Sequence, residues 1–472
     1  MTRSATGLMT VTMLTLAAIG CGGATVLEQE DPGVVTLEGA LGNAFLPAGE
    51  TGQMIARVRI GATPLEHGSR PPINLALVVD TSGSMEGEPI EDAREASLAI
   101  LDMLAEGDRL SVIAFHSTTD VLLPSTEIDD NLDELREEIA AMESRGTTDM
   151  AGGIQAGLQE IMANFQPDGI NRMVLLGDGV PNDASGIGAM AQAAGERGIA
   201  ITALGLGIDY DESLMGQIAQ GSGGRFHYVE ESEQVASVFR DEILRMQRVV
   251  GRNAVVTLQP GPGVRIDNVV GQNVGATEGA VRIVLGDLTE GEARDVIVRA
   301  TVQGRRDGAS VELMDVHLTF EDALAEAGEL ERRVFLGARA TGDAEEIRAG
   351  RNSEVERAAA RMQAAAVTVE AIRVARGGEL DRARAMLSEA ENRVQAYADE
   401  SGDAEVAEQA SGMRALSGAL PSVAPGAASG ASVSFSDDDA EGEAPSAAPM
   451  APEEAGRGVR RVHDEAMDVL GF

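Results

Sequence analysis

Long apolar runs alternate with amphipathic segments between residues 73 and 248, and this alternation constrains the fold more than any other feature. The runs span residues 73–79, 110–115, 173–176 and 199–206. The segments between them repeat apolar residues at helical spacing, at about 89–104, 132–142, 152–165, 187–196, 212–219 and 233–248. A strand that is apolar along its whole length is buried on both faces. We therefore predict an α/β domain at 73–248, a doubly wound and mainly parallel sheet covered by helices, with its ligand site beyond the carboxyl ends of the strands.

The apolar period changes to two after this domain, in runs at 254–258, 281–285 and 296–300. Turns rich in Gly, Pro and Asp separate these runs, which is typical of antiparallel strands. We predict a β-sandwich at 249–338. Residues 51–60 alternate in the same way before the α/β domain, so we expect residues 51–72 to supply strands that join the sandwich. The α/β domain would then be an insertion in the sandwich.

Helical patterns return at 342–416. Ser353 and Glu356 form a capping box at the start of one helix, and Gly377-Gly378 separates it from a second helix that begins near Glu379. We predict a helical hairpin. Residues 417–458 are rich in Pro, Ala, Ser, Gly and acids, which predicts a disordered acidic linker. Residues 459–472 are expected to be a C-terminal tail with one short amphipathic turn.

The first residues have the pattern of an export signal. Arg3 precedes an apolar stretch that is shorter than the roughly 20 residues of a membrane-spanning helix, so 1–20 is predicted to be a signal peptide. The small residues before Cys21 resemble a bacterial lipobox, and Cys21 is the only cysteine. We expect Cys21 to be lipidated, residues 21–50 to be a tether, and the protein to be an outer-membrane or cell-surface lipoprotein. The alternative is an ordinary cleaved signal with an incidental cysteine.

Composition argues against several classes of function. The formal net charge is -40, whereas nucleic-acid binding needs a clustered positive surface. All 37 basic residues are Arg, so a Walker loop with its lysine is absent. The five histidines are dispersed, without a His-Glu-x-x-His pattern, and there is no Gly-x-Ser-x-Gly elbow. We expect a binding protein, neither an enzyme nor a receptor for a small-molecule substrate.

Three distant stretches place oxygen-bearing side chains at predicted strand or helix ends. Asp80, Ser82 and Ser84 follow the first apolar run at spacing i, i+2, i+4, and Asp178 follows the third run. Thr148 lies just before the helical segment that begins at 152. Carboxylate and hydroxyl oxygens are hard donors, which suit magnesium, manganese or calcium and not zinc or copper. A hydrogen-bonded turn would explain the first stretch alone, but not all three in order.

The order Asp-x-Ser-x-Ser, then Thr before a helix, then Asp-Gly after an apolar strand resembles the von Willebrand factor type A family over roughly 72–248. Two smaller signatures agree with this resemblance, at 203–207 and 223–229. The whole layout resembles exported bacterial lipoproteins of this family and, less closely, the inter-alpha-trypsin inhibitor heavy chains.

The resemblance implies a complete metal-ion-dependent adhesion site. Ser82, Ser84 and Thr148 are then expected to ligate the ion directly, while Asp80 and Asp178 act mostly through water. Thr147 is an alternative to Thr148. Magnesium is the expected ion, with manganese or calcium as alternatives. Neutral hydroxyls leave the cation under-neutralised, so the implied partner is a protein that offers an Asp or Glu carboxylate.

Two other functions stay open. The chain would be a partner subunit of an ATPase complex, as other domains of this family are, if it were found in the cytosol. It would be an envelope structural or assembly protein if the metal only stabilised the fold. The nearby acids Asp149, Glu86 and Glu88 are expected to be solvated surface charges.

Overall fold

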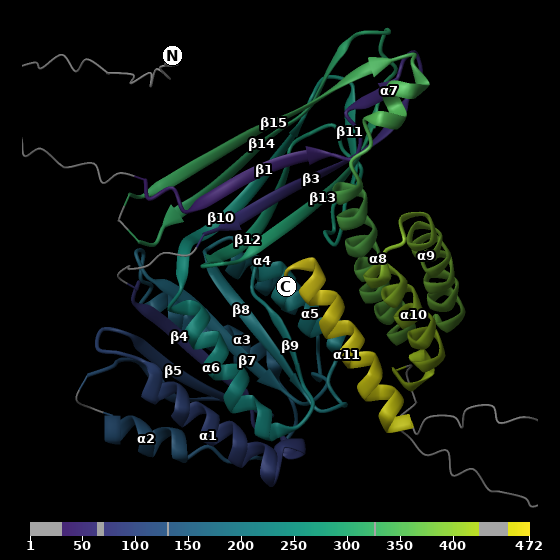
Figure 1. Ribbon diagram of the computed structural model, residues 1–472. Helices are drawn as coiled ribbons and strands as arrows, with labels where there is room; N and C mark the ends of the chain where they lie inside the picture. The colour runs from purple at the N-terminus through teal and green to yellow at the C-terminus, as the bar shows by residue number, and fades with distance from the viewer. Residues whose placement is uncertain (1–30, 64–69, 130–131, 325–326, 424–451) are drawn as a thin grey trace, which may run out of the picture.

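The computed structural model describes residues 31–63, 70–129, 132–324, 327–423 and 452–472, which form an α/β domain, a β-sandwich and a helical region (Figure 1). The expected signal peptide at 1–20 and the lipidation site Cys21 lie outside the described residues. So do residues 424–451 of the expected linker. Among the helices that are described, none has the length and apolarity needed to cross a membrane.

The α/β domain confirms the predicted fold class. Its six-stranded sheet has the order β6-β5-β4-β7-β8-β9, parallel except for the edge strand β6. The strands are β4 (Ile73–Asp80), β5 (Arg109–Phe115), β6 (Thr119–Glu127), β7 (Ile170–Gly177), β8 (Ile199–Leu206) and β9 (Phe226–Val229). The helices are η1 (Gly83–Met85), α1 (Glu88–Met103), α2 (Leu132–Ala140), α3 (Met150–Ala163), α4 (Ile187–Gly195), α5 (Glu212–Ser222), η2 (Ser232–Gln234) and α6 (Val235–Met246).

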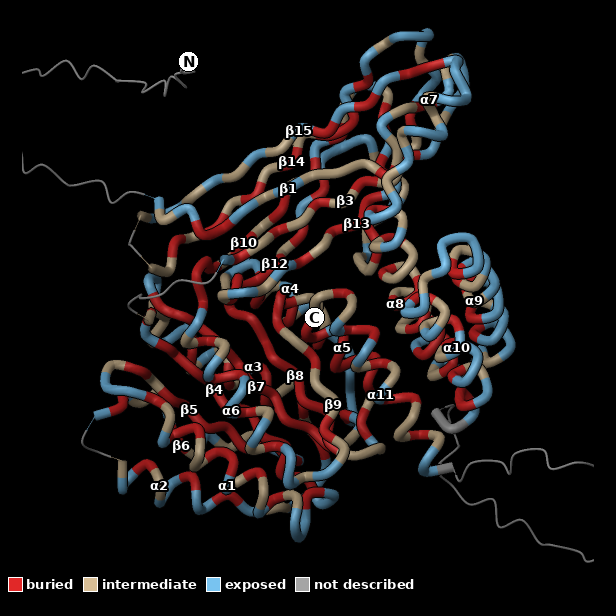
Figure 2. The backbone as a smooth tube through the Cα atoms, viewed as in Figure 1, coloured by how far each residue is buried: buried red, intermediate tan, exposed pale blue. Residues whose placement is uncertain are grey.

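Helices cover both faces of this sheet because successive side chains of each strand point to opposite sides. Leu75 and Leu77 of β4 pack in one apolar cluster with α1, α2 and α6. Ala76 and Val78 of the same strand pack in a second cluster with α3, α4 and α5. All eight residues of β4 are buried, as are all eight of β7 and of β8 (Figure 2). Burial of both faces of these strands explains the continuous apolar runs in the sequence.

The β-sandwich consists of a four-stranded sheet, β1-β3-β13-β11, and a five-stranded sheet, β12-β10-β14-β15-β2. Its strands are β1 (Val35–Leu41), β2 (Phe45–Pro47), β3 (Gly52–Ala62), β10 (Val249–Pro260), β11 (Val264–Val269), β12 (Val281–Thr289), β13 (Ala293–Val302), β14 (Ser310–Asp322) and β15 (Glu329–Thr341). Strand β3 pairs with β13 from Gly52–Val302 to Gly61–Ala293, so the segment before the α/β domain lies in the same sheet as the segment after it. The α/β domain is therefore inserted in the sandwich.

The expected tether at 21–50 is wrong for residues 35–47, which form β1 and β2. Strand β1 pairs antiparallel with β3, from Val35–Ala62 to Leu41–Ala56. Most of its side chains are only half-buried at the sheet edge, so the strand tolerates Thr, Glu and Gly. Its apolar alternation, at Val35, Leu37 and Leu41, is shorter than that of β3 and is interrupted at Gly39.

The helical region is larger than the expected hairpin. It comprises α7 (Ala344–Ala349), α8 (Ser353–Arg376), α9 (Leu380–Ser401), α10 (Ala404–Ala419), η3 (Leu420–Val423) and α11 (Pro452–Leu470). Gly402 ends α9 in the left-handed conformation, and Asp403 caps α10 by accepting from the N–H groups of Glu405 and Val406. Residues 417–423 and 452–458 are therefore helical, and the linker prediction was too wide.

The expected tail at 459–472 is also wrong, because its residues belong to α11 and dock on the α/β domain (Figure 1). Helix α11 covers the outer edge of β9, where the Asp464 carboxylate accepts a hydrogen bond of 2.8 Å from the Tyr228 N–H. His463 is fully buried and meets the Phe226 ring edge-on at 5.1 Å between centroids. The apolar face of α11 was visible in the sequence, but the surface that it covers was not.

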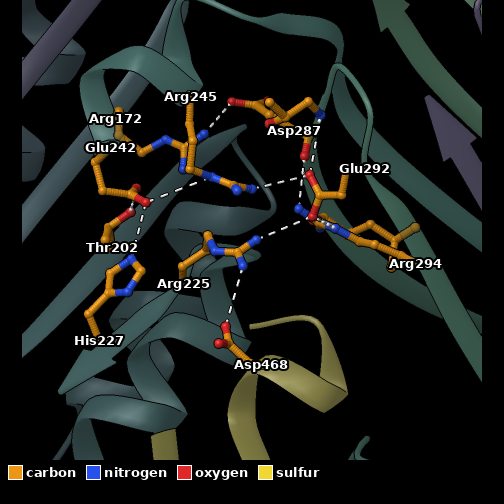
Figure 3. Close-up of polar contacts among 12 residues, drawn as sticks. Arg172, Thr202, Arg225, His227, Glu242, Arg245, Asp287, Glu292, Arg294 and Asp468 are labelled. Atoms are coloured by element: carbon orange, nitrogen blue, oxygen red, sulfur yellow. Dashed lines mark hydrogen bonds and ion pairs between the residues drawn. The ribbon is translucent and has the colours of Figure 1, made fainter. Parts of the chain in front are cut away.

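A charged cluster joins the α/β domain to the sandwich (Figure 3). Arg172 of β7 donates to Asp287 of β12 at 2.6 Å, and both side chains are nearly buried. Arg225 and Arg245 each reach Glu292 at 3.2 Å from the other side. These contacts lie at the amino ends of β7 and β9, so the sandwich leaves the carboxyl ends of the strands uncovered.

The pH dependence of stability tests how α11 is seated. Burial lowers the pKa of His463 from 6.5 to about 4; the nearby Glu212 carboxylate opposes this shift. Between those two values the unfolded chain takes up a proton that the folded protein excludes, so stability falls as the pH drops through this window. The loss is expected to be on the order of 3 kcal/mol, and His463→Leu should remove it.

Urea unfolding at several pH values measures this difference. Burial raises the pKa of Asp464 to about 6, which gives an opposite slope, but Asp464 is present in both proteins and cancels in the comparison. Equal slopes for the wild type and His463→Leu would contradict a buried neutral imidazole.

Candidate metal centre

Two adjacent strands bring the predicted site residues to one edge of the sheet. Strands β4 and β7 pair in parallel up to Val79 and Leu176, so Asp80 and Asp178 leave the sheet side by side. A Cβ atom on Gly177 would lie 3.9 Å from the Asp80 Oδ2 atom. Both carboxyl groups therefore occupy the ligand position that was expected for a parallel sheet.

Hydrogen bonds connect four of the five predicted residues. The Asp80 Oδ1 atom accepts from the Ser82 N–H at 2.8 Å, which turns the chain sharply after β4. The Ser82 and Ser84 hydroxyls are 3.0 Å apart, and the Ser84 hydroxyl donates to Asp178 Oδ1 at 2.8 Å. The spacing i, i+2, i+4 thus places the side chains of Asp80, Ser82 and Ser84 on one side of the loop, facing Asp178.

Thr148 approaches this group from the start of α3. Its side chain is buried, and its carbonyl accepts from the Asn182 N–H at 3.1 Å, which ties it to the loop that follows Asp178. A Cβ atom on Gly179 would lie 3.3 Å from the Thr148 hydroxyl and 4.0 Å from the Ser84 hydroxyl. The missing side chain at Gly179 therefore leaves space beside both hydroxyls.

Thr147 is a poorer candidate than Thr148. It is exposed, and its hydroxyl accepts from the Asn182 side chain at 3.1 Å and lies 3.4 Å from the Ser117 hydroxyl. The Thr147 hydroxyl is therefore already hydrogen-bonded at the surface of the site. Of the two threonines that the sequence left open, the geometry favours Thr148.

The electrostatics of the site call for a positive charge. Asp80 is completely buried, and its Oδ2 atom has no hydrogen-bond partner. Burial raises the pKa of Asp80 to about 7, the Ser82 N–H opposes the shift, and the Asp178 carboxylate adds to it. Burial also raises the pKa of Asp178, with Asp209 contributing repulsion. A buried carboxylate oxygen without a donor is costly unless a cation meets it.

The donor set fits a hard divalent cation. Two carboxylates and three hydroxyls supply only oxygen, as magnesium, manganese and calcium prefer. In the described part of the chain, no group of three or more His, Cys, Asp or Glu side chains is arranged to hold a metal. A cation at this edge would therefore depend on the three hydroxyls as well as on the carboxylates of Asp80 and Asp178, whose two negative charges match the charge of a divalent ion.

Some residues near the site were missed or assigned differently from the sequence. Asp209, on the loop after β8, was not singled out, although it follows the signature at 203–207 that marked a late strand. Asp149 was expected to be solvated, but it caps α3 by accepting from the Gly152 N–H at 3.1 Å. Glu86 and Glu88 are exposed, as expected.

Comparison with known proteins decides the identity of this domain. The family model described as von Willebrand factor type A domain matches residues 74–241. The chain contains a von Willebrand factor type A domain. A protein of Synechocystis described as uncharacterized is 27% identical over 287 residues, 58% of this chain and 67% of that protein. Human inter-alpha-trypsin inhibitor heavy chain H4 is 26% identical over 247 residues, 50% of this chain and 26% of its own length.

Solved structures extend the likeness of fold beyond the type A domain. A von Willebrand factor type A protein from Catenulispora acidiphila has a TM-score of 0.64 at 19% identity, over 82% of this chain and 89% of that one. The structure entitled ArnB paralog VWA2 from Sulfolobus acidocaldarius has a TM-score of 0.58 at 15% identity, over 81% and 94%. Coverage of this extent includes more than the α/β domain. The match to the Escherichia coli protein YfbK spans 43% of that protein, so activities of such relatives do not transfer as a whole.

Metal titration tests the site directly. Binding to the folded state alone, at about 100 times the dissociation constant, stabilises a protein by about 2.7 kcal/mol. We expect magnesium to raise the melting temperature of chelator-treated protein by about 5 °C, and Asp80→Ala to remove this gain. Glu312→Gln, on the sandwich surface, should keep it. A melting temperature that magnesium, manganese and calcium all leave unchanged would count against the metal centre.

Proposed function

We propose that this protein binds a protein partner in the cell envelope through a divalent cation that also contacts an Asp or Glu carboxylate of the partner. Asp80, Ser82, Ser84, Thr148 and Asp178 would hold the cation, with magnesium as the expected ion. The observation that supports the proposal is a buried Asp80 Oδ2 atom without a partner at the edge where Ser82, Ser84 and Asp178 are hydrogen-bonded to one another, with the Thr148 hydroxyl beside Gly179. When bound, the cation supplies a Lewis-acidic position for a further oxygen ligand.

The residues around the cation would favour an anionic ligand over a neutral one at this position. The Ser84 hydroxyl, held by Asp178, and the Thr148 hydroxyl are neutral donors, so they add no negative charge to that of Asp80 and Asp178. An anionic ligand then gains more at the cation than a neutral one. The edge is uncovered, because the sandwich joins the opposite ends of the strands (Figure 1). These features favour binding of a macromolecule over turnover of a substrate.

A capture experiment separates this function from the alternatives. Immobilised full-length protein is incubated with envelope extract and magnesium, and bound protein is released with chelator. Ser84→Ala and Asp178→Ala are expected to reduce capture at least tenfold, or about 1.4 kcal/mol, with an unchanged circular dichroism spectrum. Thr148→Ala should have the same effect, whereas Thr147→Ala serves as the matched control and should retain capture.

Two outcomes would contradict the proposal. If chelator lowers the melting temperature but leaves capture intact, the metal only stabilises the fold and the structural role gains support. If Thr147→Ala abolishes capture and Thr148→Ala does not, the assignment of the hydroxyl ligand is wrong.

We also propose export and lipidation at Cys21. The support is the sequence alone: an apolar stretch, small residues and a single cysteine. Metabolic labelling with radioactive palmitate is expected to mark the wild type, and Cys21→Ser should be unlabelled. Equal labelling of both proteins, or of neither, would overturn the assignment.

A further inference from the structure

The loops around the candidate metal centre carry an excess of exposed negative charge. We call residues 81–88, 141–149, 178–186 and 207–211 the metal face, since all four loops lie at the carboxyl ends of strands or, for 141–149, just before α3. Five acidic residues on this face are exposed and have no ion-pair partner among the described residues, namely Glu86, Glu88, Glu143, Asp183 and Asp209. They are additional to the buried pair of Asp80 and Asp178.

No cation of the metal face offsets this charge. Arg145 is the only basic residue in the four loops. Its guanidinium donates to the Asp120 carboxylate at 2.5 Å and is thereby neutralised at the side of the face. Asp209 follows β8 and Asp178 follows β7, and these two strands are parallel neighbours, so both acids lie at the same edge of the sheet.

The metal face also presents an apolar side chain. Val180 follows Gly179, next to the Thr148 hydroxyl, and its side chain is 54% exposed. A single exposed apolar side chain does not by itself mark an interface, but Val180 offers a partner an apolar contact at the rim of the site.

We propose that the ligand of the metal face is a protein segment in which an Asp or Glu is flanked by Arg or Lys. This inference rests on the proposed function, because the carboxylate is the group that the cation binds. The cation attracts one carboxylate, but the five exposed acids repel any further negative charge on the same segment. Basic neighbours convert this repulsion into attraction and also speed association. Segments with a net negative charge, like the acidic stretches of this chain, would therefore be repelled.

The test is a selection from a displayed library of short random peptides on full-length protein. Binding is carried out with magnesium, and clones are eluted with chelator. We expect the eluted clones to contain Asp or Glu and to be enriched in Arg and Lys. The triple variant Glu86→Gln, Glu88→Gln, Asp209→Asn should lose the enrichment in Arg and Lys but keep the requirement for a carboxylate.

A matched control variant neutralises three acidic residues that lie far from the metal face. Glu278→Gln and Glu312→Gln lie on the sandwich and Asp381→Asn on α9, and all three positions are exposed. This control should select the same clones as the wild type. The affinity of one selected peptide, at saturating magnesium, should fall about tenfold between about 0.05 M and 0.5 M NaCl, because salt screens attraction between exposed charges.

The outcomes distinguish failure of this inference from failure of the proposed function. Chelator-eluted clones with a carboxylate but without enrichment in Arg or Lys, or with affinity that rises with salt, would overturn the inference alone. Recovery of the same clones on Ser84→Ala would show binding away from the cation and would overturn the proposed function as well.

Discussion

The buried carboxyl group of Asp80 is the constraint on which the rest of this site depends. One of its oxygens fixes the turn after β4 by accepting from the Ser82 N–H, and the other lies in the interior without any partner. Such an atom is costly as a carboxylate unless a cation reaches it; without a cation, burial favours the protonated form and raises the pKa of Asp80 to about 7. The Ser84 and Asp178 side chains are already joined to each other, and the Thr148 hydroxyl lies across Gly179. These contacts form within the protein alone, so the side chains are gathered at this edge of the sheet without a ligand.

The architecture keeps this edge of the sheet accessible. The sandwich holds the α/β domain at the amino ends of its strands, where Arg252 donates to the carbonyls of Pro167 and Gly169 and Arg172 pairs with Asp287. Helix α11 covers the β9 edge and pairs its exposed N–H. An open strand edge invites pairing with other chains, and α11 prevents such pairing at β9 while leaving the metal face accessible.

Local patterns in the sequence were sufficient for most of the fold and for placing the five predicted site residues at strand and helix ends. A run such as β4 must be buried on both faces, and ligands at strand ends are read from residues that immediately follow such runs. The sequence alone did not show which distant segments pack against one another. Strand β1 is mostly half-buried and shows only a short alternation, and the sequence of α11 shows an apolar face but not the surface that this face covers. Asp209 lies near Asp178 because the strand before Asp209, β8, is the neighbour in the sheet of the strand before Asp178, β7.

The most direct test of the account is a crystal structure with manganese, located by its anomalous scattering. The account predicts a single strong peak within about 2.5 Å of the Ser82 and Ser84 hydroxyls, on the side that faces Asp80 and Asp178. An anomalous peak only elsewhere, or no peak at this position, with protein atoms filling it, would contradict the account.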